Sequence, residues 1–281
     1  MTTLEKGSQV GVDVGSSLTK VAVRDHRGRT RFKILARGAL DEVAYTVEKA
    51  RPEILGLTGG GAPRLAKILG CSSVQVCEFT AWGAGANRLL TEPHEGQAFL
   101  LVSLGTGTSV MLVDGLDVRR TGGTALGGGT ILGLGAALCN STDFATTCKL
   151  AARGKRDSVD LLVRDIYPDP DSPLKGDLTA SAFGRLGRAP SEAVERADMA
   201  ASIMRLVGEN VALIAGGHAH RQGVDRIVYG GSTLRGNPAL AQVLNEVTGM
   251  LGLKVSILKD GEFAGAVGAL EWAPHEAQDG R

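Results

Sequence analysis

A pattern that occurs twice, a glycine and hydroxyl turn between two apolar strands, most strongly restricts what this chain can fold into. The first copy is VGVDVGSSLTKVAVRD, which begins at Val10, and the second is FLLVSLGTGTSVMLVDG, which begins at Phe99. Each copy is typical of two short strands joined by a tight turn. This weak internal repeat predicts two related lobes that each begin with a hairpin and face each other across a cleft.

The segments around the first copy predict a mixed sheet with helices on its faces. TRFKILA indicates a third strand, and LDEVAYTVEKA places its apolar residues on one face of a helix. EILGLT and SVQVCEF indicate two more strands, each followed by a helical pattern, so the expected order is βββαβαβα. The polar segment HEGQ then marks a boundary between an N-terminal lobe, residues 1–95, and a C-terminal lobe, residues 96–281.

The second half contains the longest helical pattern of the chain. It runs from Ser191, a candidate N-cap, to His218, and carries many small residues. SVDLLVRDIY predicts a shorter helix before it. VDRIVYGG and LKVSIL indicate two strands after it, each followed by a turn and a helix. This order also fits an α/β lobe.

Charge and hydropathy exclude several classes of protein. The 281 residues include 31 Lys and Arg and 30 Asp and Glu, a net charge of +1, which disfavours nucleic acid as a partner. The sequence has no run of about 18 apolar residues, the length that would predict a membrane span. The N-terminal MTTLEKGSQV lacks the apolar core of a signal peptide, so we expect a cytoplasmic protein.

The cysteines and histidines do not predict a metal site. Cys71, Cys77, Cys139 and Cys148 lack CxxC spacing, so we expect buried, reduced thiols and neither zinc nor disulfides. His218 and His220 are two residues apart at the end of the long helical pattern, without an obvious third ligand. We interpret them as a polar helix C-terminus.

The 40 glycines are clustered at turns, at about twice the usual share of about 7%. Clustered glycine allows the backbone to come close to a ligand, and phosphate binding needs backbone N–H groups, hydroxyls and a cation. The first turn offers all three, and Asp13 before it is placed to hold magnesium directly or through water. For this stretch alone, a surface hairpin with an ordinary lysine is an equal alternative. The candidate nucleotide-binding residues are Asp13, Gly15, Ser16, Ser17, Lys20, Gly105, Gly127, Gly128, Gly129, Gly230 and Gly231.

The ordered set of glycine segments carries a resemblance to a known family. No P-loop pattern is present, and no GxGxxG follows the first strand. DVGSSLTK, LGTGTS and YGGS instead resemble the phosphate-1, phosphate-2 and adenosine elements of the sugar kinase/heat-shock-protein-70/actin superfamily. RRTGGTALGGGTILGL is similar to the Arg-x-x-Gly-Thr-x-x-Gly-Gly-Gly-Thr signature of type II pantothenate kinases, and GDLTASAFG and GEFAGAVGAL resemble further blocks of that family.

This resemblance spans roughly residues 10–270 and implies a fold and an activity. The implied fold is the two-lobed actin-like ATPase fold, with duplicated ribonuclease-H-like lobes whose mixed sheets are flanked by helices. The implied reaction is ATP-dependent phosphorylation of pantothenate to 4′-phosphopantothenate, the first step of coenzyme A biosynthesis, with magnesium. The implied assembly is a homodimer through the long helix. The chain departs from the family at Gly15-Ser16-Ser17, where Gly-Gly-Thr or a similar triplet is usual.

The resemblance also implies roles for four residues. Glu78, in VQVCEFTAWGAGANRLL, matches the position of the family's general base, and a carboxylate there could take the proton of the attacking hydroxyl. An acidic residue that only stabilises a helix N-terminus is the alternative interpretation of Glu78. Thr106, Ser109 and Arg120 match residues that hold pantothenate. Arg119, the neighbour of Arg120, should point to the opposite face of its strand.

Two other functions stay open on the sequence. One is a different small-molecule kinase of the superfamily, although a sugar kinase usually has a catalytic Asp where this chain has Glu78. The other is a non-catalytic nucleotide-binding regulator on the same fold. Activators of radical dehydratases begin with a similar hairpin but carry cysteines for an iron–sulfur cluster, and Cys139 and Cys148 do not resemble that arrangement.

Overall fold

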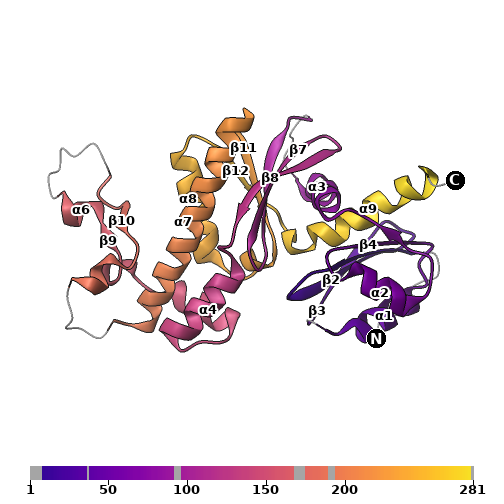
Figure 1. Ribbon diagram of the computed structural model, residues 1–281, viewed down its shortest axis with the longest axis horizontal. Helices are drawn as coiled ribbons and strands as arrows, with labels where there is room; N and C mark the ends of the chain where they lie inside the picture. Colours follow the sequence, from indigo (N-terminus) through magenta and orange to yellow (C-terminus); the bar gives the residue numbers. More distant parts are fainter. Residues whose placement is uncertain (1–7, 37, 92–95, 168–174, 189–193, 280–281) are drawn as a thin grey trace.

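Two five-stranded mixed sheets form the body of the protein, as the computed structural model shows (Figure 1). The structure describes residues 8–36, 38–91, 96–167, 175–188 and 194–279. The two sheets and their flanking helices confirm the predicted α/β architecture.

The first sheet has the strand order β3-β2-β1-β4-β5. β1, β2 and β3 form the predicted antiparallel meander, and β4 and β5 add to β1 in parallel. The apolar residues of α1 pack with those of β1 and β4 into one core, as its one-sided helical pattern predicts. The elements are β1 (Gln9–Val14), β2 (Leu18–Arg24), β3 (Thr30–Ala36), α1 (Leu40–Ala50), β4 (Ile54–Thr58), α2 (Ala62–Leu69) and β5 (Val74–Gln75).

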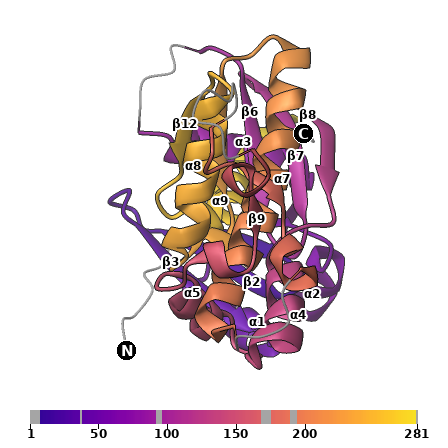
Figure 2. The same ribbon diagram turned by 90° about the vertical axis from the view of Figure 1, so that its left-hand side faces the viewer.

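The second sheet has the strand order β12-β11-β6-β7-β8, with β6, β7 and β8 antiparallel and β11 and β12 parallel to β6. Helices α4, α5, α7 and α8 build the largest core of the molecule with one face of this sheet, and α7 and α8 lie side by side there (Figures 1 and 2). The elements are β6 (Phe99–Leu104), β7 (Thr108–Asp114), β8 (Asp117–Thr124), α4 (Gly128–Cys139), α5 (Phe144–Ala151), α7 (Arg196–Gln222), β11 (Arg226–Gly230), α8 (Pro238–Met250) and β12 (Lys254–Ile257).

Two crossing helices, α3 (Glu78–Leu89) and α9 (Ala264–Asp279), connect the two sheets (Figure 1). α3 packs against the second sheet, and α9 packs against β1 and β4 of the first. Glycine makes the crossing close: a Cβ atom on Gly268 would lie 1.5 Å from the Ala81 carbonyl oxygen. The division of the chain into lobes at residues 95 and 96 stays a prediction. By sequence α9 belongs to the C-terminal lobe, but it packs against the sheet of the N-terminal lobe.

Strand alternation in the two hairpins turns one set of side chains toward α3 and α9. In β1, Val10, Val12 and Val14 enter the core with α1 and α2, so Gly11 and Asp13 face the other way, toward α9. In β6, Leu100, Val102 and Leu104 enter the core with α7, and Phe99 and Leu101 pack toward α3. The polar residues near the ends of β1 and β6 therefore face the space between the sheets.

Two segments, SVDLLVRDIY and SVQVCEF, differ from the elements that the sequence predicted for them. SVDLLVRDIY forms no single helix but a 3-10 turn, the two-residue strand β9 (Leu161–Leu162) and the short α6 (Val163–Ile166). β9 pairs antiparallel with β10 (Thr179–Ser181) in a small two-stranded sheet that projects from the body (Figure 1). The tertiary reason is the buried carboxylate of Asp160, which accepts a hydrogen bond from the Phe183 amide. SVQVCEF is a strand at Val74–Gln75 alone, because the chain starts α3 at Glu78.

The long helix α7 starts later than predicted, at Arg196 after the N-cap Glu195, and the candidate N-cap Ser191 lies outside the described residues. α7 is long and apolar enough to cross a membrane by length and composition, but most of its apolar window is buried inside the protein, as in a core helix. Cys139 and Cys148 are buried thiols as predicted, whereas Cys71 and Cys77 are exposed, which corrects the expectation for that pair.

Candidate active site

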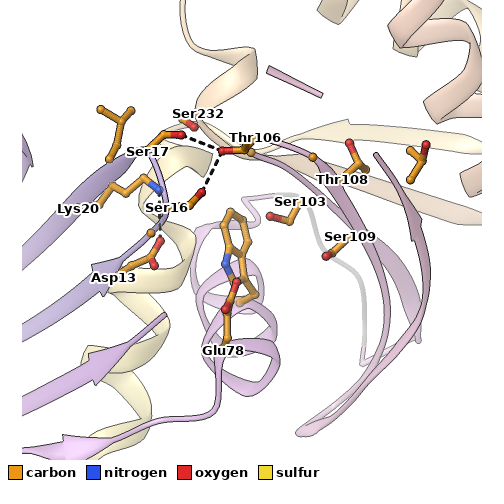
Figure 3. Close-up of a pocket in the computed structure, with 16 residues that line it drawn as sticks. Asp13, Ser16, Ser17, Lys20, Glu78, Ser103, Thr106, Thr108, Ser109 and Ser232 are labelled. Atoms are coloured by element: carbon orange, nitrogen blue, oxygen red, sulfur yellow. Dashed lines mark hydrogen bonds and ion pairs between the residues drawn. The ribbon is translucent and has the colours of Figure 1, made fainter. Parts of the chain in front are cut away.

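A cavity of about 310 Å³ lies between the two hairpins and the start of α3 (Figure 3). It brings together residues from the ends of β1 and β6, from both hairpin turns and from the first turn of α3. Three of its side chains are ionisable and most of the others are hydroxyls. The lining comprises Asp13, Gly15, Ser16, Ser17, Leu18, Lys20, Glu78, Trp82, Ser103, Gly105, Thr106, Gly107, Thr108, Ser109, Thr124 and Ser232.

Asp13 and Lys20 form a buried ion pair in this cavity. They are opposite each other in the β1–β2 ladder, and Lys20 Nζ lies 3.4 Å from Asp13 Oδ2. Only 4% of Asp13 and 8% of Lys20 is exposed. Burial raises the pKa of Asp13, and the lysine charge opposes that shift. A cation and a carboxylate are thus held together where the predicted phosphate turn begins.

Glu78 is the first residue of α3, three residues after β5 ends, so the predicted place between strand and helix is nearly correct. Burial raises the pKa of Glu78, the negative charge of Asp13 raises it further, and Lys20 opposes both. Within the described part of the chain, no hydrogen bond or ion pair engages its carboxylate. An unpaired carboxylate with a raised pKa is suited to accept a proton.

The two hairpin turns touch each other across the mouth of the cavity through hydroxyl groups. Thr106 Oγ1 lies 3.0 Å from Ser16 Oγ and 2.8 Å from Ser17 Oγ, over a sequence separation of about ninety residues (Figure 3). The Ser16 side chain is accommodated by this contact. The predicted first and second turns are therefore brought together.

A second cavity of about 600 Å³ adjoins the first, and Ser17, Thr106 and Ser232 line both. Its wall is largely apolar, with Leu132 of α4 and Phe144 of α5. A large apolar cavity beside a smaller polar one with a carboxylate fits a nucleotide. Its base would occupy the larger apolar cavity, and its phosphates would reach the smaller polar cavity.

The later glycines support the site more than they form it. Gly128 and Gly129 line the larger cavity, but their amides donate to the carbonyl oxygens of Gly105 and Thr106, so these N–H groups are already bonded. Gly127 packs behind the second turn, because a Cβ there would lie 2.8 Å from Gly107 Cα. These glycines hold the second turn in shape.

Gly230 and Gly231 line neither cavity, which differs from the predicted adenosine contact. Gly231 has φ +116, and a Cβ there would lie 2.2 Å from the Leu104 carbonyl oxygen. Glycine lets the chain pass close to β6 and places the next residues, Ser232 and Thr233, against the second turn, where Thr233 Oγ1 donates to the Gly105 carbonyl oxygen at 2.8 Å. Ser232 is the residue of this segment that lines both cavities.

Arg120 is exposed on β8 and does not line the cavity with Thr106 and Ser109, but it lies beside that cavity. A Cβ on Gly123 would lie 2.8 Å from Arg120 Nη2 and 3.4 Å from Ser109 Cα. Arg119 turns the other way and donates to Gln222 at the end of α7, as strand alternation predicts.

Several lining residues were missed by the sequence reasoning. Ser103 and Ser109 are opposite each other in the β6–β7 ladder, one pair in from the turn, as Asp13 and Lys20 are in the first hairpin. Aligning the two copies of the repeat by their turns could have found Ser103. Trp82 is another such residue, and its spacing of one helical turn from Glu78 is the signal that could have found it.

His218 and His220 lie near the C-terminal end of α7. Within the described ranges, no three His, Cys, Asp or Glu side chains gather in a way that could hold a metal ion. His218 packs against β8, where a Cβ on Gly122 would lie 2.3 Å from its Nε2, and its Nδ1 lies 2.9 Å from an Arg221 nitrogen.

Comparisons with known proteins identify relatives of the chain and of its fold. Residues 85–271 match the family model named Fumble. The chain is 34% identical to the type II pantothenate kinase of Staphylococcus haemolyticus, over 93% of this chain and 98% of that protein. Its fold is similar to component A of (R)-2-hydroxyglutaryl-CoA dehydratase from Acidaminococcus fermentans, with a TM-score of 0.65, 19% identity and coverage of 97% and 100%. It is also similar to a ROK family glucokinase from Streptomyces griseus, with a TM-score of 0.63, 16% identity and coverage of 96% and 100%.

Proposed function

The chain belongs to the type II pantothenate kinase family, and on that premise we propose that it phosphorylates pantothenate with ATP in the cavity at Glu78. The observation that carries this proposal is the unpaired Glu78 carboxylate beside the Asp13–Lys20 pair, next to a larger apolar cavity. The family supports the reaction, and the geometry supports the assignment of roles to individual residues.

In the proposed reaction, Glu78 is the general base. The primary hydroxyl oxygen of pantothenate attacks the γ-phosphorus of ATP, and its proton passes to the Glu78 carboxylate. The bond between the γ-phosphorus and the bridging oxygen breaks, and ADP leaves with that electron pair. Because phosphoryl transfer depends mainly on position and charge, we assign Lys20 and the glycines of the two hairpin turns to holding the phosphates.

We propose that magnesium binds the nucleotide phosphates next to the Asp13 carboxylate. Mg²⁺ in kinases is usually held by one or two carboxylates together with phosphates and water, and Asp13 supplies one such carboxylate in this cavity. The residues therefore fit the ion, with Asp13 as the protein ligand. Bound there, the ion would neutralise charge on the phosphates.

Pantothenate would lie on the side of Ser103 and Ser109, between β6 and β7 and the start of α3. We propose that Ser109 and Thr106 contact it and that Arg120, at the edge of the cavity, pairs with its carboxylate. A guanidinium is the side chain best suited to that planar anion. The proximity of Arg120 Nη2 to Gly123 and Ser109 supports this assignment.

The homodimer and the cytoplasmic location are proposals that rest on the family. Most apolar residues of α7 are buried by this chain itself, and Leu213, half exposed, is the large apolar side chain that α7 leaves to solvent among the described residues. We expect a partner chain to cover Leu213 if it binds along this helix.

A Glu78→Gln variant tests the central assignment. We expect its kcat for pantothenate to fall at least a hundredfold, because general-base catalysis contributes about 10²–10⁴-fold. Product formation with ATP and Mg²⁺ is measured for purified wild type, Glu78→Gln and Glu48→Gln. Glu48 is exposed on α1 and serves as the matched control, which should keep wild-type activity. If Glu78→Gln keeps a tenth of the wild-type rate, Glu78 is not the base.

A further inference from the structure

Trp82 is the one aromatic side chain that lines the cavity at Glu78, and its polar atom is unused. It follows Glu78 by four residues on α3, so the two side chains lie on the same face of that helix. Only 6% of the residue is exposed. Among the described residues nothing accepts a hydrogen bond from its indole N–H, and the nitrogen keeps its access to solvent through the cavity.

The backbone of two glycines packs against the indole ring. A Cβ on Gly230, at the end of β11, would lie 3.6 Å from its Cζ3 atom. A Cβ on Gly265, in the first turn of α9, would lie 3.2 Å from Trp82 Nε1 and 2.9 Å from Asp13 Oδ2. The indole nitrogen and the Asp13 carboxylate thus flank the same backbone position. The N–H edge of the ring is on the side of the cavity where Asp13 and Glu78 are.

A bound substrate would cut this N–H off from water, and an unpaired polar group that is removed from water is costly, so the N–H then needs a hydrogen-bond partner. An indole N–H is a donor only, so its partner must be an acceptor oxygen. On the substrate, the two candidate acceptors nearest to the reacting centre are the attacking hydroxyl and a neighbouring oxygen. A donor on the attacking oxygen would withdraw electron density from the nucleophile, so the neighbouring oxygen is the better partner.

We infer that Trp82 is a specificity-determining residue whose indole N–H donates to the secondary hydroxyl of pantothenate. This inference rests on the proposed function, because that hydroxyl is the oxygen closest along the substrate to the reacting primary hydroxyl. Glu78 and Trp82, one helical turn apart, then contact the two oxygens of a 1,3-diol: Glu78 the primary hydroxyl and Trp82 the secondary one. The apolar face of the ring covers the two methyl groups between those oxygens. The site selects an alcohol with a second oxygen at this position.

The test combines a variant with a modified substrate. Trp82→Phe keeps an aromatic ring and removes the N–H, and a pantothenate analogue with hydrogen in place of the secondary hydroxyl removes the acceptor. We expect either change alone to lower kcat/KM about tenfold, the size of one hydrogen bond, through a higher KM and a similar kcat. The two changes together should lower kcat/KM no more than either change alone, because each removes the same contact.

Trp272→Phe is the matched control. Its indole N–H already donates to Glu276 at 3.1 Å within α9, so the variant should behave as wild type toward both substrates. It also leaves Trp82 as the sole tryptophan, since the chain has two. Titration of Trp272→Phe protein with pantothenate alone should give a saturable change in tryptophan emission, and the analogue should give a weaker one.

The outcomes separate this inference from the proposed function. If wild type phosphorylates pantothenate and Trp82→Phe stays within twofold of it, the role of Trp82 is overturned and the kinase function stands. Equal losses of the variant on pantothenate and on the analogue would also overturn it, because the N–H would then serve another oxygen. If wild type forms no product from pantothenate and the emission of Trp82 does not respond to it, both proposals fail.

Discussion

The two hairpins share one backbone plan but carry different chemistry. One ladder pair in from the turn, the first hairpin has Asp13 opposite Lys20, and the second has Ser103 opposite Ser109. All four side chains line the same cavity. The first hairpin therefore contributes charge and the second contributes hydroxyls, from equivalent positions on opposite sides of one site.

This difference matches the two parts of the proposed substrate. Phosphates need a cation and, with magnesium, a carboxylate, whereas the hydroxyl and amide groups of pantothenate need neutral hydrogen-bond partners nearby. The burial of Asp13 and Lys20 is tolerable because the two charges compensate each other. In the proposed function, the ladder pairs of the two hairpins thus divide phosphate and acceptor binding between them, whereas the cavity proposed for the nucleotide base is lined mainly by the second half.

The largest expected effect comes from breaking the charged hairpin. Lys20→Met should lower kcat at least a hundredfold, because the phosphates lose their cation, and should cost about 3 kcal/mol of stability, because Asp13 is left buried without its partner. Steady-state kinetics and urea unfolding measure the two effects. Asp13→Asn/Lys20→Met should regain most of the stability and none of the activity. Recovery of activity in the double variant would contradict the role of Lys20.

A smaller effect concerns the pH dependence. Burial raises the pKa of Glu78 first, and the charge of Asp13 raises it further. A base must be deprotonated to act, so kcat/KM should fall as pH drops through this raised pKa. In Asp13→Asn the charge is removed, the pKa of Glu78 falls, and the acid limb of the profile should move to lower pH. Profiles of kcat/KM for both proteins are the measurement. An acid limb that moves to higher pH would rule out coupling between Asp13 and Glu78.

The smallest effect is expected in the hydroxyl hairpin. Ser103→Ala and Ser109→Ala should each raise the KM for pantothenate by a few fold and leave the KM for ATP unchanged, since each removes one neutral hydrogen bond worth about 1 kcal/mol. Initial rates with each substrate varied in turn provide the check. If the KM for ATP rises as much as that for pantothenate, the division of labour between the hairpins is wrong.

Local sequence patterns predicted the parts of the site that alternation controls. In VGVDVG the valines at 10, 12 and 14 form one buried face, which leaves Asp13 on the other. The pairing of Asp13 with Lys20 then follows from a short hairpin. Glu78 was found through the family resemblance, because a lone acidic residue at a helix start has no distinctive local pattern.

Other predictions failed where distant contacts decide the structure. SVDLLVRDIY has a helical pattern but breaks into short elements, since Asp160 is anchored to a residue 23 positions away. Gly230 and Gly231 line neither cavity and place Ser232 at both, so their own contact with a nucleotide stays a prediction. The exposure of Cys71 and Cys77 likewise depends on which surfaces other elements cover.

By itself the sequence determined two glycine and hydroxyl hairpins, their sheets, and the direction in which Asp13 and Lys20 point, because strand alternation and turn formation are local. Only the tertiary structure decided that Thr106 meets Ser16 and Ser17, that α9 returns to the first sheet, and that Trp82 presents a free N–H beside Glu78. These arrangements depend on how closely α3 and α9 can cross. That distance is set by contacts between glycines and carbonyl oxygens that are far apart in the chain. Local sequence patterns cannot predict such contacts.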